Sequence, residues 1–229
     1  MAMLASTSLS AAPELDSGAL YDYLAPEQVT FTKRIRNLGT TTAFVKVEVA
    51  EILYNAGDTP REQAFEGLDR PLVASPTRLI IPPGGSRELR VVYRQGREVE
   101  RYFRLRFVPA IPAVEEAMNL SREEQDDYQN VIAAGVKVLK AIGGVILVSP
   151  QPAHFRTDID QEENTVRLTN NGNTTVVLED LAQCTADGAC EQGKTVHIRP
   201  GKTFSSTAEK GQRLSFTLKE GRQRRRYAP

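Results

Sequence analysis

Tryptophan is absent from this chain of 229 residues, and histidine, cysteine and methionine occur only 2, 2 and 3 times. The histidines are His154 and His197, and with one pair of cysteines they offer too few ligands for a zinc or copper site. Basic and acidic residues balance at 29 each, so no overall field attracts nucleic acid or an anionic membrane. No run approaches the roughly 18 apolar residues of a membrane-spanning helix.

Motifs of catalysis are also missing. The chain has no G-x-S-x-G nucleophile elbow, no phosphate-binding G-x-x-x-x-G-K and no H-E-x-x-H. Its acidic pairs, Glu123-Glu124 and Asp126-Asp127, lie in a highly charged stretch and are expected to be solvated. His197 falls on the polar side of an alternating run, where a solvated side chain is expected. We therefore expect no enzyme, no catalytic residue, no metal and no cofactor.

What the chain does have is alternation of apolar and polar residues. This period of two, with turn signals between the runs, is typical of half-buried antiparallel strands. Many short strands separated by Gly and Pro turns predict an all-β protein built of sandwiches. The apolar positions of these runs are Val29, Phe31, Ile35; Val45, Val47, Val49; Leu89, Val91, Tyr93; Phe103, Leu105, Phe107; Val166, Leu168; Val196, Ile198; and Leu214, Phe216, Leu218.

A weak internal repeat divides the chain. Asn37–Thr42 and Asn170–Thr175 share the form N-x-G-x-T-T, and Ile81–Gly84 and Ile198–Gly201 both place Pro-Gly after an apolar strand. The same order in both halves predicts two similar folds. Ser149–Pro152 carries two prolines and is the natural boundary, because proline stops a strand ladder and stiffens a linker.

Three segments follow from that boundary. We expect a domain over 18–149, a second domain over 153–229, and a flexible N-terminus or signal remnant over 1–17. The first twelve residues, MAMLASTSLSAA, are small and mildly apolar but lack a basic start. They fit a trimmed signal peptide, a leftover of expression or a disordered tail equally well.

Cys184 and Cys190 flank a five-residue turn containing Asp-Gly. A local disulfide closing a strand–turn–strand corner is favoured over two free thiols. It would indicate an oxidising compartment.

Two further segments invite an interpretation. Arg222–Tyr227 is rich in arginine, but without other basic surface it is better explained as a charged edge that discourages strand aggregation than as a nucleic-acid site. Gly143-Gly144 lies inside an apolar run, where a bulge or a tight backbone contact is expected rather than a ligand loop.

Several stretches together resemble a known family. They are Val73–Val91, with its Pro, apolar run, Pro-Gly turn and Arg-bearing strand; Arg101–Phe107; Val166–Asn173; the cysteine pair; and Ile198–Phe204. In this order they resemble the periplasmic pilus-assembly chaperones of chaperone–usher systems, in the alternate class similar to colonisation-factor and common-pilus chaperones. The resemblance covers most of residues 20–220. It implies two immunoglobulin-like β-sandwiches in a boomerang arrangement and a periplasmic location.

The resemblance also implies a function. Such a chaperone binds a pilin that lacks its last strand, fills the groove with the last strand of its own first domain, and passes the pilin to an outer-membrane usher. Neither nucleic acid nor membrane insertion is implied, and a self-capping homodimer is a further possible partner. We expect the lent strand within Asn130–Val148, with groove-facing residues Ile132, Ala134, Val136 and Val138. The long charged loop Ala113–Gln129 before it favours this role over that of a plain core strand.

Family members anchor the pilin's C-terminal carboxylate with basic side chains. The usual Arg of the first strand and Lys of the last strand are missing here, since Gly18–Leu24 carries no Arg and Gly144 or Val145 stands at the Lys position. The alternative anchors are Arg104, Arg106, Lys137 and Lys140.

The resemblance further implies that Arg90 and Glu100 form a structural pair orienting the domains. A structural pilus or adhesion protein with tandem immunoglobulin-like domains would show the same strand pattern. It remains the alternative function.

Overall fold

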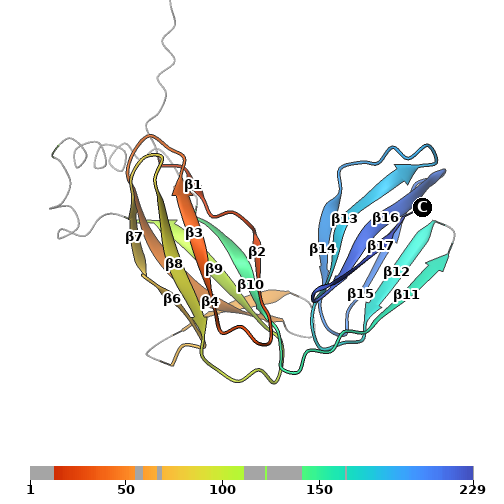
Figure 1. The fold of residues 1–229 in the computed structure, drawn as a ribbon, viewed down its shortest axis with the longest axis horizontal. Coiled ribbons are helices and arrows are strands. Elements are labelled where there is room, and N and C mark those ends of the chain that lie inside the picture. Colours follow the sequence, from red (N-terminus) through yellow and green to blue (C-terminus); the bar gives the residue numbers. More distant parts are fainter. Residues whose placement is uncertain are drawn as a thin grey trace, which may run out of the picture. The chain divides into compact units, whose positions relative to one another are not determined.

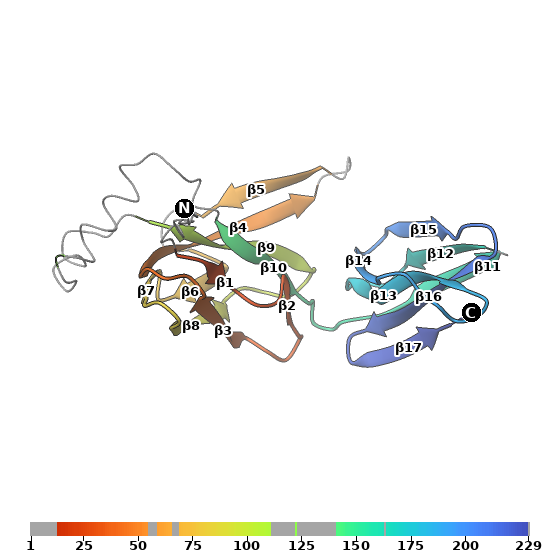
Figure 2. The same cartoon turned by 90° about the horizontal axis from the view of Figure 1, so that it is seen from above.

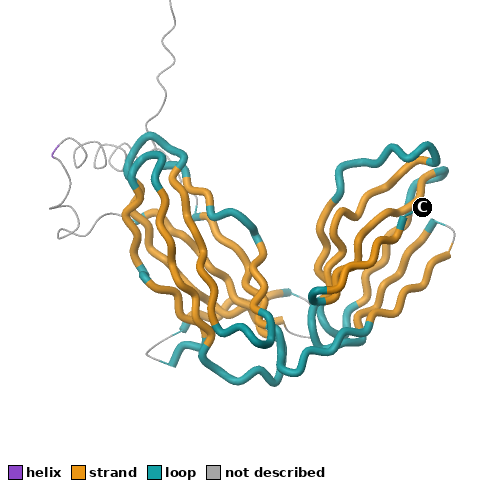
Figure 3. Tube along the Cα trace, viewed as in Figure 1, coloured by secondary structure: helices purple, strands orange, loops and turns teal. Residues whose placement is uncertain are grey.

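The computed structural model describes residues 13–54, 59–65, 69–110, 122, 141–162 and 164–228. Nearly all of the described residues lie in strands or connecting loops (Figure 3). It divides into two compact units, and in each the strands form a pair of sheets. The predicted all-β fold with two sandwiches is therefore confirmed. Within the described ranges there is no helix long and apolar enough to cross a membrane.

The first unit comprises Met1–Leu24, Val29–Gln95 and Tyr102–Leu147. One of its sheets has the order β1-β3-β8-β6 (Figure 1). These strands are β1 (Leu15–Asp16), β3 (Thr30–Asn37), β8 (Ser86–Tyr93) and β6 (Leu72–Ser75). The strands pair antiparallel. Ile35, Leu89 and Val91, which the alternation predicted to face inward, are buried.

The second sheet of this unit has the order β2-β10-β9-β4-β5, and β7 also pairs with β4. Its strands are β2 (Tyr21–Leu24), β10 (Ile142–Val148), β9 (Arg101–Pro109), β4 (Ala43–Tyr54), β5 (Pro60–Ala64) and β7 (Arg78–Ile81). Phe103, Leu105 and Phe107 of β9 are fully buried, as their alternation predicted. The N-terminal segment changes sheets, because β1 pairs with β3 whereas β2 lies beside β10.

The second unit comprises Ala25–Gln28, Gly96–Arg101 and Val148–Pro229. Its sheets have the orders β11-β12-β15 and β14-β13-β16-β17 (Figure 2). The strands are β11 (Thr157–Glu162), β12 (Thr165–Asn170), β15 (Thr203–Thr207), β14 (Lys194–Ile198), β13 (Val176–Thr185), β16 (Gln212–Glu220) and β17 (Gln223–Tyr227). Leu168, Leu178 and Leu218 are among the fully buried residues of its core.

The repeated sequence motifs occupy equivalent places in the two units. The N-x-G-x-T-T segments form the corners from β3 to β4 and from β12 to β13, where the chain passes from one sheet to the other. The Pro-Gly segments turn the chain from β7 into β8 and from β14 into β15, and both Gly84 and Gly201 have positive φ, at 67° and 72°. Glycine suits these positions because a Cβ atom disfavours that conformation.

Candidate functional site

Strand β10 is the described part of the stretch predicted to hold the lent strand. It lies between β2 and β9 in the second sheet of the first unit. The predicted groove-facing residues Ile132, Ala134, Val136 and Val138 lie outside the described residues, as does the preceding loop Ala113–Gln129 apart from Arg122. The position of β10 therefore shows where the C-terminal end of the predicted stretch lies in the first unit. The assignment of the donor residues stays a prediction.

Two glycines allow β10 to lie unusually close to its neighbours. A Cβ atom on Gly143 would stand 2.0 Å from the carbonyl oxygen of Leu105 on β9, and one on Gly144 would stand 2.7 Å from that of Leu20. Real Cβ contacts are not this short, so any side chain here would displace backbone. The predicted tight backbone contact at Gly143-Gly144 is confirmed.

A buried cation holds the segment next to β10. Lys33 of β3 is only 5% exposed, and its Nζ donates to the Ala19 carbonyl at 2.9 Å and to Asp22 Oδ2 at 2.6 Å. Between these two partners, the Leu20 carbonyl accepts a 2.7 Å hydrogen bond from the backbone N–H of Val145 on β10. Lys33 therefore positions the strip of chain that covers one side of β10.

The sequence carried a signal for Lys33 that was missed. Lys33 shares the parity of Phe31 and Ile35, the inward side of β3, where a charge is rarely buried without a partner. A lone cation on an apolar parity predicts a carboxylate partner nearby. Asp22, on the first strand where the family resemblance implied an arginine, is that partner, with a half-buried side chain.

The edge strand β2 and its flanks display apolar side chains. Leu20 and Val29 are 66% and 58% exposed, and Tyr21 and Tyr23 are 39% and 40% exposed. These four are most of the large apolar side chains that the described residues expose. Leu20, Tyr21 and Tyr23 lie on β2 or directly before it, whereas the Val29 carbonyl accepts from the N–H of Tyr93 on β8. Exposed apolar groups gathered on one strand are typical of an interaction surface.

Arg104 and Arg106, the predicted carboxylate anchors on β9, both bind a carboxylate within the first unit. Arg106 Nη2 lies 2.6 Å from Glu62 Oε2, and Arg104 Nε lies 3.3 Å from Glu62 Oε1. Partial burial opposes ionisation of Glu62, but Arg106 and Arg104 outweigh it and lower the pKa of that carboxyl. The other predicted anchors, Lys137 and Lys140, lie outside the described residues.

Arg90 and Glu100 fall in different units. Arg90 is an exposed residue of β8 and stands opposite Thr32 and Ser75 in the ladder. Glu100 belongs to the second unit, where it accepts hydrogen bonds from the backbone N–H of Thr175 at 2.9 Å and from its hydroxyl at 2.5 Å. The proposed pairing of Arg90 with Glu100 stays a prediction.

Arg97 binds three pieces of the second unit together. Its Nη1 donates to the carbonyls of Ala25 at 3.1 Å and Ser149 at 2.9 Å, and its Nη2 donates to the carbonyl of Gln28. Gln151 in turn donates its N–H to the Arg97 carbonyl at 2.8 Å. No sequence pattern distinguished Arg97 from the other arginines, because its partners are backbone groups.

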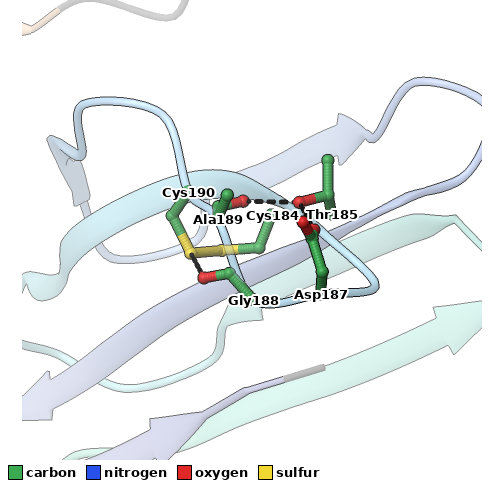
Figure 4. Close-up of a disulfide and its surroundings, with 6 residues drawn as sticks. All are labelled: Cys184, Thr185, Asp187, Gly188, Ala189 and Cys190. Carbon is green, nitrogen blue, oxygen red and sulfur yellow. Dashed lines mark hydrogen bonds between the residues drawn. A yellow bond between two sulfur atoms is a disulfide. The ribbon is translucent and has the colours of Figure 1, made fainter.

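Cys184 and Cys190 form a disulfide, as predicted (Figure 4). It closes the turn that follows β13, and within that turn the Thr185 hydroxyl donates to the Asp187 carboxylate and lies 3.0 Å from the Ala189 carbonyl. Hydrogen bonding by Thr185 lowers the pKa of Asp187. Over the described part of the chain, no group of three or more His, Cys, Asp or Glu side chains is arranged to bind a metal ion.

No protein-family model matches the chain, and no curated protein matches it in sequence. Among solved structures, the class 5 fimbriae chaperone CfaA aligns over 94% of this chain and 100% of its own, with a TM-score of 0.58 and 18% identity.

The chain has the fold of a fimbrial chaperone.

Two further chaperone structures support that statement. A chain from a study of the chaperone–tip adhesin complex of CFA/I fimbriae aligns over 94% of this chain and 99% of its own (TM-score 0.55, 16% identity). One from the CsuC–CsuE chaperone–tip subunit complex of archaic Csu pili of Acinetobacter baumannii aligns over 95% and 97% (TM-score 0.52, 12% identity). The fimbrial chaperone fold thus spans both units, as the motif resemblance implied. At these identities the likeness is one of fold.

Proposed function

We propose that this protein is a chaperone that binds fimbrial subunits and stabilises them by lending a strand, before an outer-membrane usher receives them. The observation that carries the proposal is the match to fimbrial chaperones along 94% of the chain, through both units. Two of the matched structures are described as chaperone–tip subunit complexes. The proposal assigns this chain a comparable partner and a binding role without catalysis.

The lent strand is assigned to Ile132, Ala134, Val136 and Val138. These residues end at Val138, shortly before β10 begins at Ile142, and β10 lies between β2 and β9 with close backbone contacts at its two glycines. A strand that emerges from a fixed one can add to an incomplete sheet, gaining main-chain hydrogen bonds for affinity and pockets for alternate side chains. Each large aliphatic buried this way contributes about 1.5–3 kcal/mol.

Arg104 and Arg106 are assigned to the subunit's C-terminal carboxylate. Their shared grip on Glu62 supports this, because two guanidinium groups that hold one carboxylate can exchange it for another. Glu62 is then a resident occupant that the subunit displaces. Glu62→Gln is expected to weaken the contact between Glu62 and the two arginines and so to tighten subunit binding. Arg106→Ala is expected to weaken subunit binding.

The location assigned to the protein is the periplasm. One matched structure, SfaE, is described as a periplasmic chaperone. The Cys184–Cys190 disulfide supports an oxidising compartment, since such bonds persist in the bacterial periplasm and are rare in the cytosol.

Co-expression with the neighbouring pilin, followed by size exclusion, tests the function. The wild-type chain should elute with one pilin as a 1:1 complex. Val136→Asp should abolish that complex while circular dichroism stays unchanged, and Ala133→Asp, on the opposite parity, serves as the matched control. An intact complex with Val136→Asp refutes the strand assignment. Failure to capture any pilin refutes the chaperone function, and polymerisation of this chain instead supports a structural pilus protein.

A further inference from the structure

Two edge strands of the second unit carry opposite charges. In the sheets of the described residues, β11 and β17 each have a single neighbouring strand, β12 and β16 respectively. The sequence of β11 is TDIDQE and that of β17 is QRRRY. Each strand thus has one side with unpaired backbone N–H and C=O groups, which can accept another strand.

In both strands the acidic or basic side chains lie on the outer face of the strand's own sheet, away from the core. Ile159 packs against the core, so Asp158, Asp160 and Glu162, which alternate with it, point away. On β17, Tyr227 packs against the core and stacks on Phe216 with ring centroids 4.9 Å apart. Arg224 and Arg226 therefore point outward as well.

Some of these charges form no ion pair with the residues that the structure describes, namely Asp160, Glu162 and Arg226. Arg224 binds Glu179, and Asp158 accepts from Asn171 and lies 3.9 Å from Arg156. Like charges facing one another repel, which disfavours β11 pairing with β11 or β17 with β17 across two molecules. Pairing β11 with β17 instead sets acids against arginines.

We propose that β11 of one copy of this chain pairs with β17 of a second copy, so that the second units associate through complementary strand edges. Both strands carry their outward charges at a spacing of two, so Asp160 faces Arg224 in either strand direction. Arg226 then faces Asp158 in an antiparallel pair and Glu162 in a parallel pair. The strands of this contact are residues 157–162 and 223–227, which do not include the proposed donor strand. It does not depend on the proposed chaperone function.

The test is analytical ultracentrifugation of the full chain without any subunit, over a wide range of concentration and salt. The wild-type protein should associate as concentration rises, and salt should reverse this because it screens exposed charges. Arg226→Asp should weaken association roughly tenfold, from a lost attraction and a new repulsion. Arg213→Asp makes the same charge change on β16, a central strand, and should leave association unchanged.

Mixing and double variants give the decisive readouts. A mixture of Arg226→Asp and Asp160→Arg should associate better than either alone, because each molecule retains one intact edge. Restoration by Asp158→Arg in the Arg226→Asp chain indicates antiparallel pairing, and restoration by Glu162→Arg indicates parallel pairing. A wild-type chain that stays monomeric at low salt overturns the proposal. Equal effects of Arg226→Asp and Arg213→Asp, or a mixture that fails to associate, overturn it as well.

Discussion

The carboxamide of Asn170 makes the same three hydrogen bonds in the second unit that the carboxamide of Asn37 makes in the first. Each Nδ2 donates to the carbonyl four residues later, at 2.9 and 2.7 Å, and to the carbonyl of Ile198 or Ile81, at 2.8 and 3.0 Å. Each Oδ1 accepts from the glycine N–H two residues later, at 2.9 and 3.0 Å. Both asparagines are fully buried. In each unit this one side chain therefore links the N-x-G-x-T-T segment to the Pro-Gly segment.

Replacing this side chain should destabilise the unit that contains it. Asn170→Ala leaves two carbonyls and one N–H without their partner, and each unsatisfied buried group costs about 1–3 kcal/mol. We expect the free energy of unfolding to fall by about 3 kcal/mol or more, measured by urea unfolding with hydrogen exchange in β12 and β13. Asn171→Ala is the control, since its exposed side chain donates a hydrogen bond to the exposed Asp158, and its cost should stay below about 1 kcal/mol. Equal costs for the two variants would contradict the role of Asn170.

Replacing Lys33 should loosen the strip of chain beside β10. Lys33→Met removes the ammonium from a nearly buried ion pair and strands Asp22 and the Ala19 carbonyl. A loss of about 3 kcal/mol is expected, because removing one member of a buried pair leaves the other uncompensated.

The informative readout for Lys33→Met is the amide of Val145, whose hydrogen bond to Leu20 should exchange faster. Arg34→Met is the matched control, since Arg34 is the next residue along β3 and makes an exposed pair with Glu88. It should cost less than about 1 kcal/mol. Unchanged exchange at Val145 in Lys33→Met would show that Lys33 does not hold this strip.

The two glycines of β10 should differ in their tolerance of a methyl group. Gly143→Ala would place a Cβ 2.0 Å from the Leu105 carbonyl oxygen of β9, whereas Gly144→Ala would place one 2.7 Å from the Leu20 carbonyl oxygen, a less severe overlap. Thermal unfolding should therefore show a larger loss for Gly143→Ala. The opposite ranking would mean that β9 yields more easily than the edge.

Stability of the second unit should depend on pH through His197. Burial, with a contribution from Lys219, lowers the pKa of His197 to about 4. The unfolded chain binds this proton near pH 6.5 and the folded chain only near pH 4, so stability contributed by the neutral imidazole is present above pH 6.5 and is lost as pH falls towards 4. His197→Gln should flatten the curve of unfolding free energy against pH in that window. A wild-type slope retained in His197→Gln would assign the dependence to carboxylates such as Glu179.

Local patterns predicted the architecture because buried and exposed residues alternate along an antiparallel strand, so the sequence itself shows which side is buried. Phe103, Leu105 and Phe107 read correctly as one inward face, and the Cys184–Cys190 pair followed from spacing alone. The prediction for His197 was wrong. Its place on the polar side of the run predicted a solvated side chain, yet the imidazole is half-buried and its pKa is lowered.

The candidate site was less accessible to such patterns. The Glu62 carboxylate lies 42 and 44 residues from Arg104 and Arg106 in the sequence. The Asp22 carboxylate is close to Lys33 in the sequence, but it lies on β2, in the other sheet from β3. Such partners depend on how the strands are ordered into sheets, which the period of two alone does not specify.

The second unit is discontinuous in sequence, because it needs Arg97 and Glu100 as well as the C-terminal stretch. A fragment beginning at residue 149 would lack the carboxylate that binds Thr175 and the guanidinium that binds the Ser149 carbonyl. In a chain that emerges N-terminus first, everything assigned to the first unit is already present when Leu147 appears. The fold thus sets an order of assembly. The second unit is completed last, when its C-terminal strands pack onto Ala25–Gln28 and Gly96–Arg101, which were synthesised much earlier.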